Sequence, residues 1–161
     1  MRLTRNSQML GAAAKGAPVY HYLDRTTASL DLGGRFLVWA ARGWVQAVSR
    51  RQCPCNALAD GFARWNAAEA LQSFSMAMAI LNCEAGEALY FRAPGHSRVS
   101  DDEALLLDLF EQASRRPHNE MREMLGMIVP PTSAPALQIA IETAAAAFEA
   151  IGLSPSAQHG K

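Results

Sequence analysis

Apolar side chains recur along most of the chain at the spacing that buries one face of a helix. The first such segment covers about residues 32–50. Its apolar positions follow the i, i+4, i+7, i+11 pattern of one helix face, at Leu37, Ala41, Trp44 and Val48. Arg35 and Arg42 fall on the solvent-facing side, where Trp39 is an unusual apolar neighbour. Similar stripes predict four further helices, over about 56–82, 101–115, 117–128 and 133–151.

The second predicted helix, over about 56–82, is apolar on two sides. Phe62 and Trp65 lie on one side, and Leu71 and Phe74 lie on the opposite side at 100° per residue. A helix that is apolar on two sides packs against neighbours on both. We therefore expect this helix to be the centre of the fold, with the side chains of Trp65 and Phe74 both buried.

Local signals mark several helix ends. Ser100-Asp-Asp-Glu103 precedes a leucine run and has the form of a capping box. Gly152 follows the last apolar stripe and suits the end of a helix. Together these features predict a single all-α domain with a bundle of about five helices over 31–152. A mobile or loosely docked arm would cover 1–30, and a loose tail would cover 153–161.

Composition agrees with this fold class. A chain of 161 residues is long enough for one domain, and 30 residues are Ala whereas only 16 are Val, Ile or Thr. The net charge is zero, but residues 1–55 hold eight Arg or Lys against two Asp. Such a basic arm suits a DNA-associated regulator. No dense basic patch or nucleic-acid-binding module accompanies it, so nucleic acid is a disfavoured partner.

No segment has the apolar length of a membrane span, about 20 residues, or the form of a secretion signal. The three cysteines are an odd number. We therefore expect reduced thiols in a cytoplasm, without contact with a membrane. The Arg- and Ala-rich composition is typical of a GC-rich bacterial genome.

Cys53-Pro-Cys55 precedes the second predicted helix, and Cys83 follows it. These thiolates could bind zinc with His96 or His118 as a further ligand, form a redox pair, or match a haem-responsive Cys-Pro site. An unbroken helix between Cys55 and Cys83 would be about 40 Å long, which separates them too far to share one ion. We therefore interpret the thiols as structural and predict no cofactor, with zinc and haem as minority alternatives.

Glu69 and Gln72 project from the second predicted helix toward the face of Trp65. A carboxylate buried there must be paired or neutral. Arg35 or Arg42 would be its partner, although both lie away from the apolar face of their own helix. The other interpretations are a small-molecule pocket lined by Glu69, Gln72 and Trp65, a place at the rim of the bundle, and a subunit contact.

The chain carries no metalloprotease, di-iron, phosphate-loop or Gly-x-Ser-x-Gly signature, so we lean against an enzyme. The surplus of apolar helix faces, with Trp39 and the small-residue face around Gly43, favours a noncatalytic interaction or scaffold protein that forms a homo-oligomer. The first alternative is a small-molecule- or metal-binding bundle that uses Glu69 and Gln72 or the cysteines. The second is a DNA-associated regulator that uses the N-terminal arm.

Three segments resemble a group of short uncharacterised helical proteins of alphaproteobacteria. They are Phe36-Leu-Val-Trp-Ala-Ala-Arg-Gly-Trp44, the stretch from Pro94-Gly through Ser100-Asp-Asp-Glu-Ala-Leu-Leu-Leu, and the Pro-Pro turn before the Ala-rich last helix. The resemblance covers about residues 33–152. It implies a helical fold and no particular activity.

Overall fold

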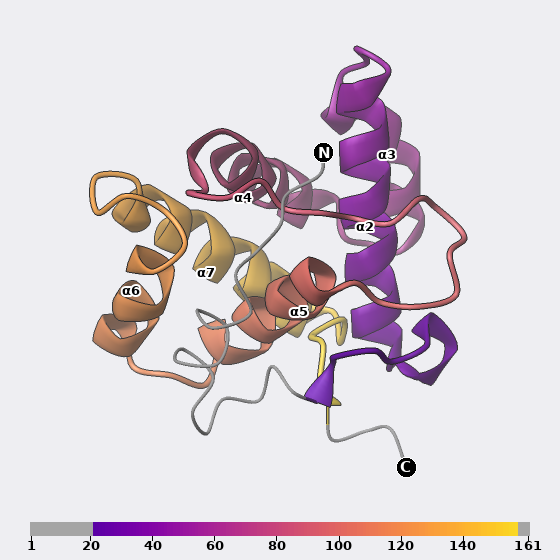
Figure 1. Ribbon diagram of the computed structural model, residues 1–161. Helices are drawn as coiled ribbons and strands as arrows, with labels where there is room; N and C mark the ends of the chain where they lie inside the picture. Colours follow the sequence, from indigo (N-terminus) through magenta and orange to yellow (C-terminus); the bar gives the residue numbers. More distant parts are fainter. Residues whose placement is uncertain (1–20, 158–161) are drawn as a thin grey trace.

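The computed structural model describes residues 21–157, and within that range the chain is helical (Figure 1). Its α-helices are α2 (Leu32–Ser49), α3 (Pro54–Arg64), α4 (Leu71–Glu84), α5 (Asp101–Ala113), α6 (His118–Gly126) and α7 (Ala134–Ala150). Short 3-10 turns form η2 (Thr27–Ser29) and η3 (Ala68–Ala70). The only strand-like contact in this range is one bridge between Thr26 and Arg98. The all-α class is confirmed, with six helices in the described residues where the apolar pattern predicted five.

The additional helix arises because the predicted 56–82 helix is broken in its middle. Asn66 has a φ of 58°, in the left-handed region that Asn adopts more readily than most residues. Two backbone hydrogen bonds close the end of the helix here. The Asn66 amide donates to the Ala63 carbonyl at 3.1 Å, and the Ala67 amide donates to the Phe62 carbonyl at 2.7 Å. These paired bonds form a Schellman cap, which ends α3.

This break lets Phe62 of α3 and Phe74 of α4 enter the same core. In one straight helix, residues 12 positions apart would be about 18 Å apart along the axis. The two ring centroids are instead 5.7 Å apart. Because of the break, the two apolar faces of the predicted helix both pack into the same hydrophobic core.

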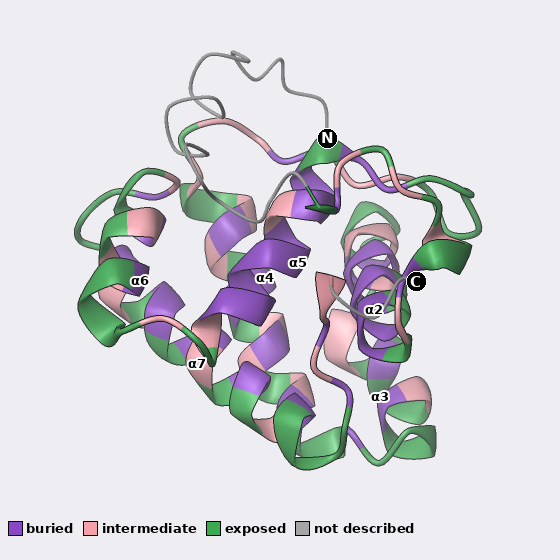
Figure 2. Ribbon diagram, turned by 90° about the horizontal axis from the view of Figure 1, so that it is seen from below, coloured by how far each residue is buried: buried purple, intermediate pink, exposed green. Residues whose placement is uncertain are grey.

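The centre of the core is a closed ring of five buried phenylalanines, each from a different helix. Neighbouring ring centroids are 5.0 to 6.3 Å apart around the circuit Phe36 (α2), Phe62 (α3), Phe74 (α4), Phe110 (α5) and Phe148 (α7). Helix α7 packs against α4, α5 and α6. Buried positions line the sides of the helices that face one another (Figure 2). Helices α2 and α4 likewise each pack against three other helices. The unbroken 56–82 helix that we predicted as the centre of the fold is not formed.

The break also corrects three predictions about exposure. Phe74 is fully buried as predicted, but Trp65 forms the C-cap of α3 and its side chain is 46% exposed. Glu69 lies in η3 and Gln72 in the first turn of α4, and both are exposed. The buried carboxylate that we expected at position 69 is therefore not formed.

Both described ends of the chain pack against the helices. After Gly152, which has a φ of 75°, Leu153 is buried and its carbonyl approaches Gly33 so closely that a Cβ there would lie 2.4 Å from the oxygen. Leu153 and Ser154 therefore pack on the start of α2, and the Ser156 amide donates to Asp31 Oδ2 at 2.9 Å, although we had predicted a loose tail. Tyr22, inside the predicted arm, is fully buried. The rest of the arm (1–20) and of the tail (158–161) lies outside the described residues.

The exposures of Phe74 and Trp65 give a direct test of the broken helix. We expect Phe74→Ala to lower the free energy of unfolding by about 3–5 kcal/mol, because it opens a cavity among the five buried phenylalanine side chains. Trp65→Ala should cost less than about 2 kcal/mol, because nearly half of its side chain is already in water. Urea unfolding of the two variants measures both values. Equal, large losses would contradict the break.

Candidate functional site

The segment that joins α4 to α5, residues 85–100, runs along the outer side of α2 (Figure 1). It covers Arg42, which we had placed on the solvent-facing side of its helix. The Arg42 side chain is only 4% exposed. The prediction failed because helical periodicity reports which face of α2 is polar, and not whether a loop covers that face.

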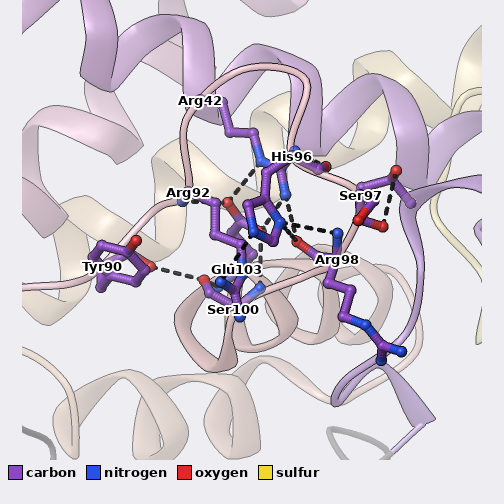
Figure 3. Close-up of polar contacts among 9 residues, drawn as sticks. Arg42, Tyr90, Arg92, His96, Ser97, Arg98, Ser100 and Glu103 are labelled. Atoms are coloured by element: carbon purple, nitrogen blue, oxygen red, sulfur yellow. Dashed lines mark hydrogen bonds and ion pairs between the residues drawn. The ribbon is translucent and has the colours of Figure 1, made fainter.

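Arg42 is buried against Glu103 of α5 in a two-pronged ion pair (Figure 3). Its Nε donates to Glu103 Oε1 at 2.8 Å, and its Nη2 donates to Oε2 at 2.9 Å. The guanidinium also donates to the carbonyl of His96 at 2.7 Å and to that of Arg98 at 2.8 Å. Arg42 thus uses four of its five N–H groups and ties α2 to both α5 and the loop.

Glu103 completes this network from the other side. It is 1% exposed and accepts the backbone amides of Arg92 at 2.8 Å and Ser100 at 2.9 Å. The Ser100 hydroxyl accepts the Glu103 amide at 3.1 Å and donates to the Tyr90 carbonyl at 2.8 Å. The predicted capping box is therefore confirmed. Its glutamate has a second role that the motif does not reveal, as the counter-charge of Arg42.

The outer edge of the loop is basic. Pro94 and Gly95 form a turn in which Gly95 has a φ of 84° and the His96 amide donates to the Ala93 carbonyl at 3.1 Å. Arg92 and His96 lie on the two sides of this turn, and Arg92 Nη1 is 3.5 Å from His96 Nε2. Beyond it, Arg98 Nη1 is 3.0 Å from Asp24 Oδ1.

A second polar cluster fastens the ends of the described chain to α5. The Tyr22 hydroxyl donates to Glu111 at 2.5 Å, and the Ala157 amide donates to the same carboxylate at 3.3 Å. Arg115 pairs with Glu111 at 2.9 Å. Burial, followed by the hydrogen bond to Glu111, raises the pKa of the Tyr22 hydroxyl above its ordinary range, so Tyr22 acts as a neutral donor here.

Asp108 lies one turn before Glu111 and is 1% exposed. Its side chain accepts a bond from Gln112 at 3.3 Å. Burial raises its pKa from 3.8 to about 6, and the charge of Glu111 adds to the rise, whereas Gln112, Arg116 and His21 oppose it. The acids within the apolar run of α5 were visible in the sequence, but their partners were not.

Two half-exposed tryptophans lie on the α2–α3 side of the molecule. Trp39 is 45% exposed, and its ring rests on α3 at Gly61, where a Cβ would lie only 2.1 Å from Trp39 Cη2. The Trp39 and Trp65 rings each contact Phe36, with centroids 5.5 and 6.3 Å apart. We call these two side chains, with the Phe36 ring beneath them, the tryptophan surface.

The remaining predicted site residues are not brought together. Cys53 and Cys83 are exposed, Cys55 is partly buried, and all three thiols are free. Among residues 21–157, no three His, Cys, Asp or Glu side chains gather as metal ligands. Gly43 is partly buried and packs against α3, where a Cβ would lie 2.8 Å from the Leu58 side chain. No helix of the described chain is long and apolar enough to cross a membrane.

The first prediction from this site concerns the buried ion pair. Glu103→Gln should lower the free energy of unfolding by about 3–5 kcal/mol, because it leaves the Arg42 charge buried without its counter-charge. The 85–100 loop should also become sensitive to proteases. Asp24→Asn removes the partner of Arg98 at an exposed site and should cost less than about 1 kcal/mol. Equal effects of the two variants in urea unfolding would contradict the role given to Glu103.

The second prediction concerns Asp108. Its pKa in the folded protein is above the ordinary value, so the folded chain binds one more proton between about pH 4 and pH 6. Stability should therefore fall as pH rises through this window, by up to about 3 kcal/mol at roughly 1.4 kcal/mol per pKa unit. Asp108→Asn should remove that fall and raise the urea midpoint at pH 7.5. Asp60→Asn, at an exposed position, is the control and should show the pH profile of the parent protein. If Asp108→Asn also showed the parent's pH profile, Asp108 would not be the source of the pH dependence.

Comparison with protein families, curated proteins and solved structures found no match for the chain. The resemblance to short helical proteins of alphaproteobacteria therefore stays a prediction.

Proposed function

We propose that this chain is a noncatalytic interaction protein that self-associates through the tryptophan surface. The observation that carries the proposal is the pair Trp39 and Trp65, each nearly half exposed over one buried ring. Tryptophan is enriched among the residues that dominate binding energy, since its ring buries a large apolar area on contact. Both rings are held by contacts within the domain, so little side-chain freedom would be lost on binding.

The distribution of charged side chains indicates which part of a second copy would cover the tryptophan surface. Helices α2 and α3 and the turn between them expose Arg35, Arg50, Arg51 and Arg64 against the single acid Asp60. Helices α6 and α7 expose acidic side chains at Glu120, Glu123 and Glu149. The two regions are complementary in charge, whereas two tryptophan surfaces facing each other would bring like charges together.

Helix α7 also offers an apolar contact point. Ile139 is 62% exposed, and Glu142 lies one turn further along the same face. The α2–α3 pair and α6 lie on opposite sides of the molecule in both views (Figures 1 and 2). The proposed contact is therefore head-to-tail, with the tryptophan surface of one copy on the Ile139 face of the next. A contact of this kind extends into chains or rings instead of stopping at a dimer.

The proposed setting is the cytoplasm. The three free thiols fit a reducing compartment. A contact formed by two tryptophans and a few charges is small, so we expect association in the micromolar range that weakens as salt increases.

The test uses two variants that each block one side of the contact. The parent protein should sediment as concentration-dependent oligomers, whereas Trp65→Ser and Ile139→Arg should each remain monomeric. A mixture of the two variants should form dimers and nothing larger, because each variant retains one intact face. Met76→Ser, at an exposed apolar residue on α4, should associate like the parent.

Three outcomes would contradict the proposal. One is a parent protein that stays monomeric at high micromolar concentration. Another is a mixture of the two variants that stays monomeric although both are folded by circular dichroism. The third is association of Trp65→Ser equal to that of the parent.

A further inference from the structure

Arg92 and His96 approach each other on the outer side of the 85–100 loop, across the Pro94-Gly95 turn (Figure 3). Arg92 Nη1 and His96 Nε2 are 3.5 Å apart. Whether this contact is a hydrogen bond depends on where the imidazole carries its proton, because a guanidinium nitrogen can only donate.

The other ring nitrogen of His96 assigns that proton. Nδ1 lies 3.1 Å from the Arg98 amide nitrogen, which donates to it. An amide N–H can only donate, so Nδ1 carries a lone pair and the neutral ring is protonated at Nε2. Nδ1 also lies 3.3 Å from the Arg98 carbonyl, but a proton on Nδ1 would leave the hydrogen of the Arg98 amide, whose nitrogen is 3.1 Å away, facing another hydrogen. The shorter, amide contact therefore determines the tautomer.

It follows that two donors face each other with no acceptor between them. His96 Nε2–H and the Arg92 guanidinium both direct hydrogens into the same space. Arg92 Nε is in addition buried with no hydrogen-bond partner in the structure. Within residues 21–157, the Arg92 guanidinium forms no ion pair with a carboxylate.

We propose that Arg92 and His96 bind an oxyanion, a carboxylate or phosphate group whose oxygens accept from both side chains. Such an acceptor satisfies the facing donors and balances the Arg92 charge. The neighbouring cations already have partners, since Arg42 pairs with Glu103 and Arg98 pairs with Asp24. Arg92 is thus the guanidinium of this loop that is left for an external anion.

The backbone positions that carry both side chains are held in advance. The Arg92 amide is held by Glu103, and the His96 carbonyl is held by Arg42. Between them, the turn at Gly95 sets the spacing. The site is therefore built on the buried ion pair, and little backbone ordering remains to oppose binding. It does not depend on the proposed self-association, because neither Trp39 nor Trp65 contributes to it.

The experiment is an NMR titration of the full chain, labelled with ¹⁵N, at low ionic strength. Sulfate is the first probe, because it stays a dianion over the pH range used. The His96 ring nitrogens and the Arg92 Nε should shift in a saturable way. Methyl phosphate and acetate, titrated in parallel, distinguish a phosphate from a carboxylate ligand by their relative affinity.

Arg92→Gln and His96→Gln should each weaken sulfate binding at least about tenfold, as expected for loss of a charge-assisted hydrogen bond. The matched control is Arg50→Gln, at an exposed arginine at the end of α2, which should bind like the parent. Three results would overturn the proposal. One is a set of ring ¹⁵N shifts that places the neutral proton of His96 on Nδ1. Another is no saturable shift with any of the three anions. The third is binding of sulfate by Arg92→Gln equal to that of the parent.

Discussion

The buried ion pair between Arg42 and Glu103 organises the part of the molecule that the helices alone leave undetermined. Two charges removed from water are tolerated only when their remaining hydrogen-bonding groups are also satisfied. Here the 85–100 loop supplies them, with two carbonyls for the guanidinium and two amides, of Arg92 and Ser100, for the carboxylate. The requirement is mutual, because these carbonyls and amides would otherwise lack partners. One interaction therefore joins α2 and α5 and gives the loop between α4 and α5 its course.

The apolar core obeys a separate constraint. Five helices each bring one phenylalanine to the same ring, and α3 and α4 can both do so only because the chain turns at Asn66. The turn that buries Phe74 also leaves Trp65 at the end of α3, half in solvent. The surface that we propose for self-association is thus a consequence of how the core is closed. The oxyanion site depends in the same way on the ion pair, since Glu103 and Arg42 hold the backbone of Arg92 and His96.

Local chemistry was readable from the sequence, and long-range pairing was not. The helical segments outside 56–82, the Ser100 capping box and the burial of Phe74 follow from rules that span a few residues, and the structure confirms them. Asn66 carried a signal for a helix end that we overlooked, because the apolar stripe continues past it. Glu69 was misjudged for the same reason, since its predicted face assumed an unbroken helix. Arg42 and Glu103 are 61 positions apart, and no periodicity indicates that a loop would cover a polar helix face.

Hydrogen exchange of single backbone amides tests most directly whether the ion pair orders the loop. The Arg92 amide donates to a buried carboxylate, although it lies in a segment with no regular secondary structure. It should therefore exchange with solvent about as slowly as amides in the middle of α5, whereas the amide of the exposed Gly95 should exchange rapidly. Exchange of the Arg92 amide at the rate of Gly95 would show that Glu103 does not hold the loop, and would contradict the account.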